Sequence, residues 1–305
     1  MSGFLLSMQG AISQGVLWGI MVLGVYITYK ILNIADLTVD GSFALGGCVC
    51  ATLIAGFGWD PLLALIVASL TGVVAGAITG FLHTVFEIPA ILAGILTQIA
   101  LWSINLRIMG GKSNIPLLKS RTIFTWLVDT TGLSQSQIGL FVGILIAALM
   151  IFLLYWFFGT ELGATLRATG NNEDMIRALG VNTKRTKMLA LMLSNGLVAL
   201  SGGLVCQSQK YADINMGTGA IVIGLASIVI GGVVMGHLRS FGSKLASTVM
   251  GAIIYFLIRA IVLRMGMDAN DMKLLSAIIV ALALWIPVAT QKWQIKRSYT
   301  EGGNS

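Results

Sequence analysis

Long apolar runs alternate with short polar interruptions along almost the whole chain. Nine of these runs approach the roughly 17–25 helical residues that cross a hydrocarbon layer of about 30 Å. The runs lie near 11–30, 41–57, 61–82, 88–108, 138–158, 188–206, 219–236, 245–264 and 272–290. The pattern predicts an all-α polytopic membrane protein with about nine transmembrane helices, between the limits of eight and ten.

The polar stretches between these runs are short. The two longest, 109–137 and 159–187, are each too small to bury a core of their own. Residues 1–305 are therefore predicted to form a single transmembrane domain. The basic cluster of Lys184, Arg185 and Lys187 stands just before a span, so 159–187 is expected to be cytoplasmic and 109–137 to be an outer loop.

The composition supports lipid as the main solvent. Hydrophobic residues make up 56% of the chain and charged residues 10%, whereas charged residues are about a quarter of an ordinary soluble domain. The net charge of +7 could suggest a nucleic-acid partner. The basic residues are scattered between apolar blocks and form no stripe, so no nucleic-acid binding is expected.

Residue types that carry catalysis or bind metals are sparse. Cys48 and Cys50 lack the two-residue spacer of a redox or zinc motif, and Cys206 stands alone in an apolar run. His83 and His237 stand at span ends without a second ligand at metal-binding spacing. We therefore predict packing thiols, no metal site, no catalytic residue and no enzymatic activity.

One fragment imitates an ATP-binding loop. Gly111, Lys112 and Ser113 follow one another as at the end of a P-loop, but Leu106 occupies the position of the required earlier glycine. The fragment also belongs to the predicted outer loop, away from cytoplasmic ATP. The chain is not expected to bind ATP itself.

The cytoplasmic stretch 159–187 has the signals of a short helix. Asn172 is a favourable N-cap, and Glu173 and Asp174 suit the positive end of the helix dipole. Gly180 suits the C-terminal stop. A helix of about two turns is predicted between them.

The apolar side of this short helix has an expected use. Met175, Ile176 and Leu179 form a small stripe flanked by Arg167 and Arg177, with no local core to bury it. Such a helix is suited to docking in a groove of another protein. The alternative is a helix that lies flat at the membrane interface.

A polar break, 32–47, separates the first two spans. It contains Asn33, Asp36, Asp40 and Ser42, and carboxylates are costly near hydrocarbon unless they cap a helix, pair or face water. Broken helices at such positions often form a substrate route or gate, so these four residues are the candidate path residues. The alternative is a simple turn, in which Asp40 caps the second span.

Three amides interrupt or end apolar runs, namely Gln98, Asn105 and Asn195. Each is predicted to make a hydrogen bond between helices, with a contact to a transport path as the alternative.

Glycines recur at helical spacing at Gly72, Gly76 and Gly80. Such ridges let helix backbones approach closely in lipid. Tight packing within one subunit is expected, and a subunit interface is the alternative.

The docking segment also resembles a known motif. Residues 167–182 read Arg-Ala-Thr-Gly-Asn-Asn-Glu-Asp-Met-Ile-Arg-Ala-Leu-Gly-Val-Asn. They are similar to the coupling-helix motif of permeases in the branched-chain amino acid and ribose family of ABC importers, approximately Arg-Ala-x-Gly-x-Asn-x-x-Ala-Ala-x-x-x-Gly-Ile. Met175 and Ile176 replace two alanines, which points to a bulkier fit. The stretches 32–47 and 224–236 resemble the same family, the first most closely in its aromatic amino acid branch.

The resemblance implies the rest of the assembly. It implies a multi-pass permease of the bacterial plasma (inner) membrane, surrounded by lipid and paired with a second permease copy, most simply as a homodimer. Separate ATPase subunits would use ATP, so this chain would bind no cofactor, and an extracytoplasmic binding protein would deliver substrate. ATPase coupling would fall to Arg167, Gly170, Asn172, Met175, Ile176, Leu179 and Gly180.

The expected function is therefore a path for a small solute, an amino acid by resemblance, with a sugar or nucleoside still open. A secondary transporter or channel is the alternative. It would need ion or proton sites inside the membrane, and the span centres contain almost no carboxylates.

Overall fold

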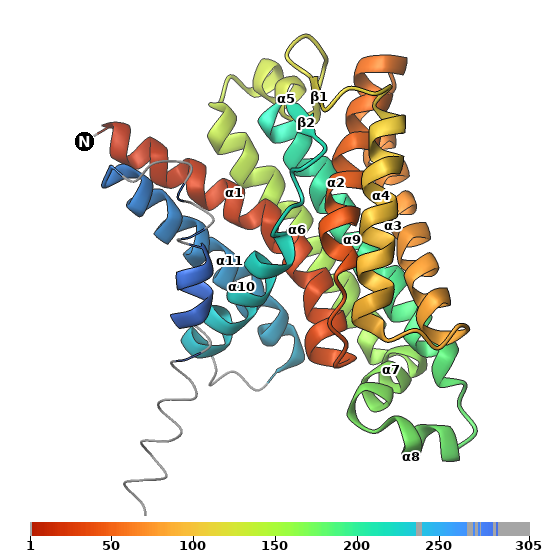
Figure 1. Cartoon of the computed structure of the whole chain (residues 1–305). Coiled ribbons are helices and arrows are strands. Elements are labelled where there is room, and N and C mark those ends of the chain that lie inside the picture. Colours follow the sequence, from red (N-terminus) through yellow and green to blue (C-terminus); the bar gives the residue numbers. More distant parts are fainter. Residues whose placement is uncertain are drawn as a thin grey trace, which may run out of the picture.

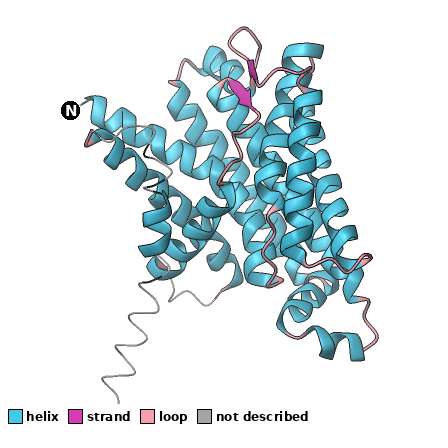
Figure 2. Ribbon diagram, viewed as in Figure 1, coloured by secondary structure: helices cyan, strands magenta, loops and turns pink. Residues whose placement is uncertain are grey.

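The structure is a computed structural model that describes residues 2–235 and 240–266, together with 271, 274, 276–282 and 285. Helices make up nearly all of it, as Figure 2 shows. The transmembrane-length helices and their π-helical extensions are α1 (Ser2–Tyr26) with η1 (Ile27–Ile31), α2 (Thr38–Ala51) with η2 (Thr52–Gly56), α3 (Pro61–Thr84), α4 (Ala90–Ile108), α6 (Gln135–Gly159), α9 (Thr183–Gln209) and α11 (Phe241–Arg264). The shorter elements are β1 (Asn114–Pro116), α5 (Ile123–Thr131), α7 (Glu161–Asn171), α8 (Glu173–Ala178), β2 (Tyr211–Asp213) and α10 (Ala220–Val234).

The described residues contain seven helical segments that are long and apolar enough to cross a membrane. The all-α polytopic prediction is confirmed, but the count of nine is not. The predicted span 219–236 forms only the 15-residue helix α10. Most of the predicted span 272–290 falls outside the described residues.

Small elements mark the two ends of the helical bundle. The strands β1 and β2 and the helix α5 lie at one end, and α7 and α8 lie at the other (Figure 1). The strands are antiparallel, with Ile115 opposite Ala212. The predicted outer loop 109–137 is therefore partly ordered into a strand and a capped helix, in which Thr122 accepts a hydrogen bond from the backbone of Thr125.

The helix α9 is the centre of the bundle, packed against α1, α2 and α3. The glycine ridge of α3 makes its closest approach here. A Cβ on Gly76 would clash with the carbonyl oxygen of Leu191, and one on Gly72 would clash with that of Asn195. The prediction of tight packing within one subunit is confirmed for this ridge.

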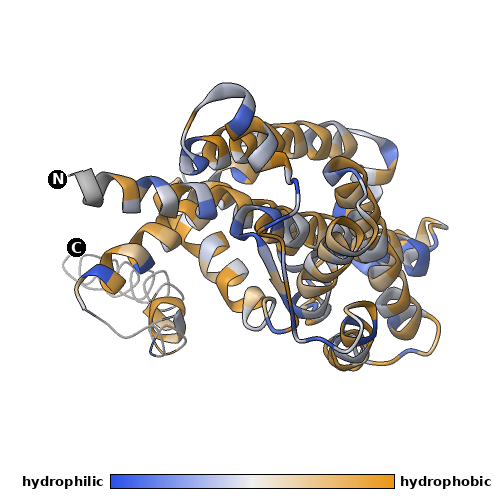
Figure 3. Ribbon diagram, turned by 90° about the horizontal axis from the view of Figure 1, so that it is seen from above, coloured by the Kyte–Doolittle hydropathy of each residue, from blue (hydrophilic) through white to orange (hydrophobic). Residues whose placement is uncertain are grey.

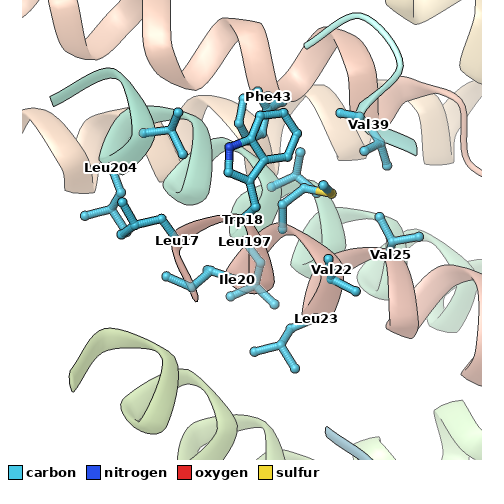
Figure 4. Close-up of a cluster of buried hydrophobic side chains, with 14 of the residues drawn as sticks. Leu17, Trp18, Ile20, Val22, Leu23, Val25, Val39, Phe43, Leu197 and Leu204 are labelled. Carbon is cyan, nitrogen blue, oxygen red and sulfur yellow. The ribbon is translucent and has the colours of Figure 1, made fainter. Parts of the chain in front are cut away.

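Large side chains of α1 fill the space beside α2 and α9. The rings of Trp18 and Phe43 have centroids 4.5 Å apart, and Leu17, Leu197 and Leu204 surround them (Figure 4). Most residues of the span Leu6–Ile31 are buried inside the bundle. The apolar surface of α1 is therefore covered mainly by other helices and not by lipid.

The outer sides of α3 and α6 are apolar and exposed in the isolated chain. On α3 these residues are Leu62, Leu63, Ile66, Leu70, Val74, Ile78 and Phe81; on α6 they include Phe141, Ile144, Leu145, Leu149 and Phe152. Hydrophobic residues recur along the ribbons when the bundle is seen from above (Figure 3). These faces have the composition expected next to lipid.

Candidate functional site

A hydrogen-bonded network lies where α2 begins. Asp36 caps α2 by accepting a hydrogen bond from the backbone N–H of Thr38 at 2.9 Å. The Asn195 amide donates to the second oxygen of Asp36 at 2.7 Å and accepts from the Ser42 hydroxyl at 2.7 Å. Asp36, Ser42 and Asn195 are buried. The hydrogen bond predicted for Asn195 is therefore confirmed.

The position of this network sets the depth at which α2 starts. Asn195 lies near the middle of α9, a helix long enough to cross the membrane. α2 consequently begins beside the middle of its neighbour and not at the end of the bundle. The connection 32–37 is non-helical backbone in which Leu32 and Asp36 are buried and Asn33 and Ala35 are exposed.

Asp40 belongs to a second junction. Its two carboxylate oxygens accept hydrogen bonds from the backbone N–H groups of Gly219 at 2.8 Å and Ile221 at 2.9 Å. Asp40 therefore caps α10, and the prediction that it caps its own span is wrong, because α2 has already begun at Thr38. The N-termini of α2 and α10 meet through this side chain.

Such a junction has electrostatic consequences. Each helix N-terminus carries about half a positive charge and unpaired N–H groups. In transporters, interrupted helices of this kind place their N-terminal ends near the substrate path. The polar break is therefore a non-helical connection between two separate spans, and the residues that follow it bring the N-termini of α2 and α10 together.

The structure divides the four candidate path residues among three places. Asp36 and Ser42 are enclosed in the network around Asn195. Asp40 lines a cavity of about 240 Å³ between α2, α4 and the segment 214–218. Asn33, with a left-handed backbone at φ 61°, lines a separate cavity of about 590 Å³ near Arg167.

Asn105 contradicts the prediction of an interhelical hydrogen bond. Its side chain is only 1% exposed, and neither its amide nitrogen nor its oxygen has a hydrogen-bond partner among the described residues. It lines the 240 Å³ cavity together with Gln98 and Asp40. A buried amide without partners is rare enough to require an explanation.

The short helix predicted in 159–187 is present as α8. Asn172 caps it by accepting a hydrogen bond from the backbone N–H of Met175 at 3.0 Å. Gly180 follows with φ 85°, a left-handed conformation that glycine adopts without strain. The longer helix α7 precedes α8, so the loop holds two helices.

The apolar stripe of α8 is smaller than predicted. Met175 is 50% exposed and Leu179, the residue that ends the helix, is 71% exposed. Ile176 is only 6% exposed, because it turns toward the rest of the chain. Its assignment to an exposed stripe is wrong, and two apolar side chains remain on the surface.

Two other residues assigned to ATPase coupling make contacts within the chain. The Arg167 guanidinium donates to the carbonyl oxygen of Phe158 at 2.8 Å and lies 5.5 Å from the ring centroid of Phe241. Gly170 packs against the backbone of Ile31, where a Cβ would clash. Both residues hold α7 against the bundle.

An acidic residue ties α8 to α9. Glu173 forms ion pairs with Arg177, one turn later, and with Lys187 of α9. Burial alone would raise the pKa of the Glu173 carboxyl, but the hydrogen bonds and charge of Lys187, with those of its other donors, hold this pKa below its ordinary value. α8 is therefore positioned by a charged contact at its N-terminal end.

The comparisons with known proteins agree with this architecture. Residues 7–284 match the family described as branched-chain amino acid transport system, permease component. The chain belongs to this family. The permease is 40% identical over 280 residues to the tyrosine transport system permease protein of Clostridioides difficile, covering 90% of each chain.

Two further relatives extend the comparison. The permease is 35% identical to an uncharacterized protein of Rickettsia prowazekii, over 90% of this chain and 95% of the relative. It is 24% identical to the ribose import permease protein RbsC of Escherichia coli, over 87% and 81% of the two chains. No solved structure matches the chain.

The resemblance carried by residues 167–182 is thereby confirmed at the level of the family. The permease is a multi-pass protein of the inner membrane and a component of an ABC-type transport system.

Proposed function

We propose that the permease forms the translocation path for an aromatic amino acid, with tyrosine the first candidate, and that a separate ATPase drives it. The junction of α2 and α10 at Asp40 carries the geometric part of this proposal. It brings two helix N-termini together at the wall of the cavity of about 240 Å³, and helix N-termini border the substrate sites of several transporters. The name of the Clostridioides difficile relative supports the substrate.

ATP hydrolysis by the separate ATPase would act on the permease through α8. Met175 and Leu179 are exposed at the end of the bundle that carries the basic cluster before α9. Two adjacent apolar side chains on a capped helix suit insertion into a groove of a soluble ATPase subunit. ATP would be bound by that subunit and not by this chain.

The other partners follow from the same arrangement. The end formed by β1, β2 and α5 would receive the extracytoplasmic binding protein (Figure 1). A second copy of the permease would complete the path as a homodimer, and lipid would cover the apolar faces of α3 and α6. ATP-driven movement of α8 would rock the two copies between outward and inward openings.

A secondary transporter or channel remains the alternative class. It would need titratable or ion-binding groups within the membrane. The seven candidate spans contain one acidic residue, Asp40. Two backbone N–H groups of the α10 N-terminus already occupy its carboxylate, which favours a structural role and an external energy source.

Uptake of radiolabelled tyrosine tests the proposal. A strain deleted for the chain should lose energy-dependent uptake, and the wild-type gene should restore it. Competition with unlabelled tryptophan, leucine and ribose then defines the substrate class. Uptake that is equal in the deleted and complemented strains would contradict the assigned substrate.

A further inference from the structure

We infer that the cavity of about 240 Å³ between α2, α4 and the segment 214–218 is a contact site for a zwitterionic amino acid in transit. This inference rests on the proposed transport function and assigns it a location and a set of side chains. The unpaired Asn105 amide, beside a rim that contains Trp102, is the observation that carries it.

Asn105 supplies both kinds of hydrogen-bonding group at one point. Its amide nitrogen donates and its oxygen accepts, and both lack partners among the described residues. Leaving a buried polar group unpaired is costly, so a ligand that pairs both atoms recovers that free energy. An ammonium and a carboxylate on the same carbon atom present this combination.

The charges around the cavity favour a solute that is neutral overall. Among the described lining residues, Asp40 is the one charged side chain, and its carboxylate is bonded to the N-terminus of α10. A net anion would meet no cation here. The polar groups of Gln98, Ser103 and Thr218 add neutral donors and acceptors.

The rim adds an apolar contact. Trp102 is 50% exposed and Ile99 is exposed beside it, both on α4. An indole face packs favourably against another aromatic ring. An aromatic amino acid would therefore place its charged end on Asn105 and its ring on Trp102.

The size of the cavity is better suited to transient contact with a solute than to its stable binding. Sites that enclose small molecules usually exceed about 300 Å³. A smaller, partly open site holds a solute weakly enough to release it, as conduction requires. The mixed polar and apolar lining also distinguishes this face from the apolar outer side of α3.

Cysteine labelling tests whether the cavity is accessible to water and whether an amino acid binds in it. Ser103→Cys should react with a membrane-impermeant thiol reagent in the membrane-embedded transporter, and tyrosine should slow this reaction at least about threefold. Cys48, Cys50 and Cys206 are buried, which makes the native background suitable. Leu149→Cys, on the apolar face of α6, is the control and should stay unlabelled.

The other standard amino acids serve as further protectants. Protection by none of them, or no labelling of Ser103→Cys, would overturn the site. If the wild type takes up no tyrosine but another amino acid protects the thiol of the Ser103→Cys variant, the site stands and the proposed substrate is wrong.

Substitution of Asn105 separates ligand binding from structure. Asn105→Leu should raise the KM for tyrosine uptake about tenfold or more, a loss of about 1.4 kcal/mol or more of binding free energy, because both hydrogen bonds to the solute are removed. Because leucine has no unpaired polar atoms, the same variant should unfold at an equal or higher temperature than the wild type without ligand. A lower unfolding temperature with an unchanged KM would show a structural role and overturn the inference.

A matched pair of tryptophans tests the rim. Trp102→Leu should raise the KM, whereas Trp126→Leu should leave it unchanged, because Trp126 is similarly exposed at 48% but lies on α5, outside the cavity lining. Equal effects of both substitutions would contradict a specific contact at Trp102.

Discussion

The carboxylate of Asp40 accepts a hydrogen bond from the backbone N–H of Ile221 at 2.9 Å, across 181 residues of sequence. A side chain of α2 therefore caps α10. Together with the bond from Gly219, this contact satisfies N–H groups at the start of α10 that have no partner within the helix. The two helices are held at the same depth, which links the polar break after α1 to the late spans of the chain.

Replacement of Asp40 tests this cap. Asp40→Ala should destabilise the permease by about 1–3 kcal/mol, because the α10 N-terminus loses its acceptors. Asp40→Asn should cost less, since its amide oxygen still accepts one hydrogen bond. The unfolding temperature in detergent measures both effects. An alanine variant as stable as the wild type would contradict the capping role.

Asn195 is expected to matter more for folding than the residues it joins. Asn195→Leu leaves the buried Asp36 carboxylate and Ser42 hydroxyl without their amide partner, whereas Ser42→Ala removes one bond and its donor together. Thermal unfolding should show the larger loss for Asn195→Leu, about 2–3 kcal/mol against about 1 kcal/mol. Equal losses would show that the Asp36 contact contributes little.

Local signals in the sequence were sufficient for several parts of this structure. Seven of the nine predicted apolar runs coincide with the candidate spans among the described residues, and the Asn172 and Gly180 signals predict the start and end of α8. Capping chemistry acts over a few residues, so it can be recognised without the fold.

The partners of Asp40 and Asn105 could not be predicted in the same way. Asp40 bonds to residues far along the chain, and Asn105 remains unpaired because the neighbours available on α4 and α2 leave a cavity. The burial of Ile176 likewise depends on how α8 meets the bundle. Such features depend on tertiary packing, which helical periodicity does not specify.

The glycine ridge provides a prediction with an internal control. Gly76→Ala should destabilise the permease, because the new Cβ would clash with the carbonyl oxygen of Leu191 and would force α3 away from α9. Gly232→Ala should be neutral or stabilising, since nothing lies within 4 Å of its Cβ position and alanine favours helix. Comparing the two unfolding temperatures checks the packing. A tolerated Gly76→Ala would contradict it.

The attachment of α8 should depend on pH through Glu173. Its pKa is lower in the folded protein than in the unfolded chain, so its contribution is present above about pH 4.3 and is lost as pH falls through the folded pKa. Glu173→Gln should reproduce the loss at neutral pH and speed tryptic cleavage in 177–187. Asp174→Asn, an exposed neighbour, is the control. Unchanged cleavage in Glu173→Gln would contradict the role of the ion pairs.

The central claim is that α8 couples this permease to a separate ATPase. Affinity purification of the tagged permease from its native membrane, with quantitative mass spectrometry, tests it most directly. We expect an ABC ATPase at equal abundance with the wild type, its loss with Leu179→Asp, and its retention with Leu118→Asp, an exposed leucine near β1. A Leu179→Asp variant that retains the ATPase, or a wild type that carries none even after crosslinking, would contradict the claim.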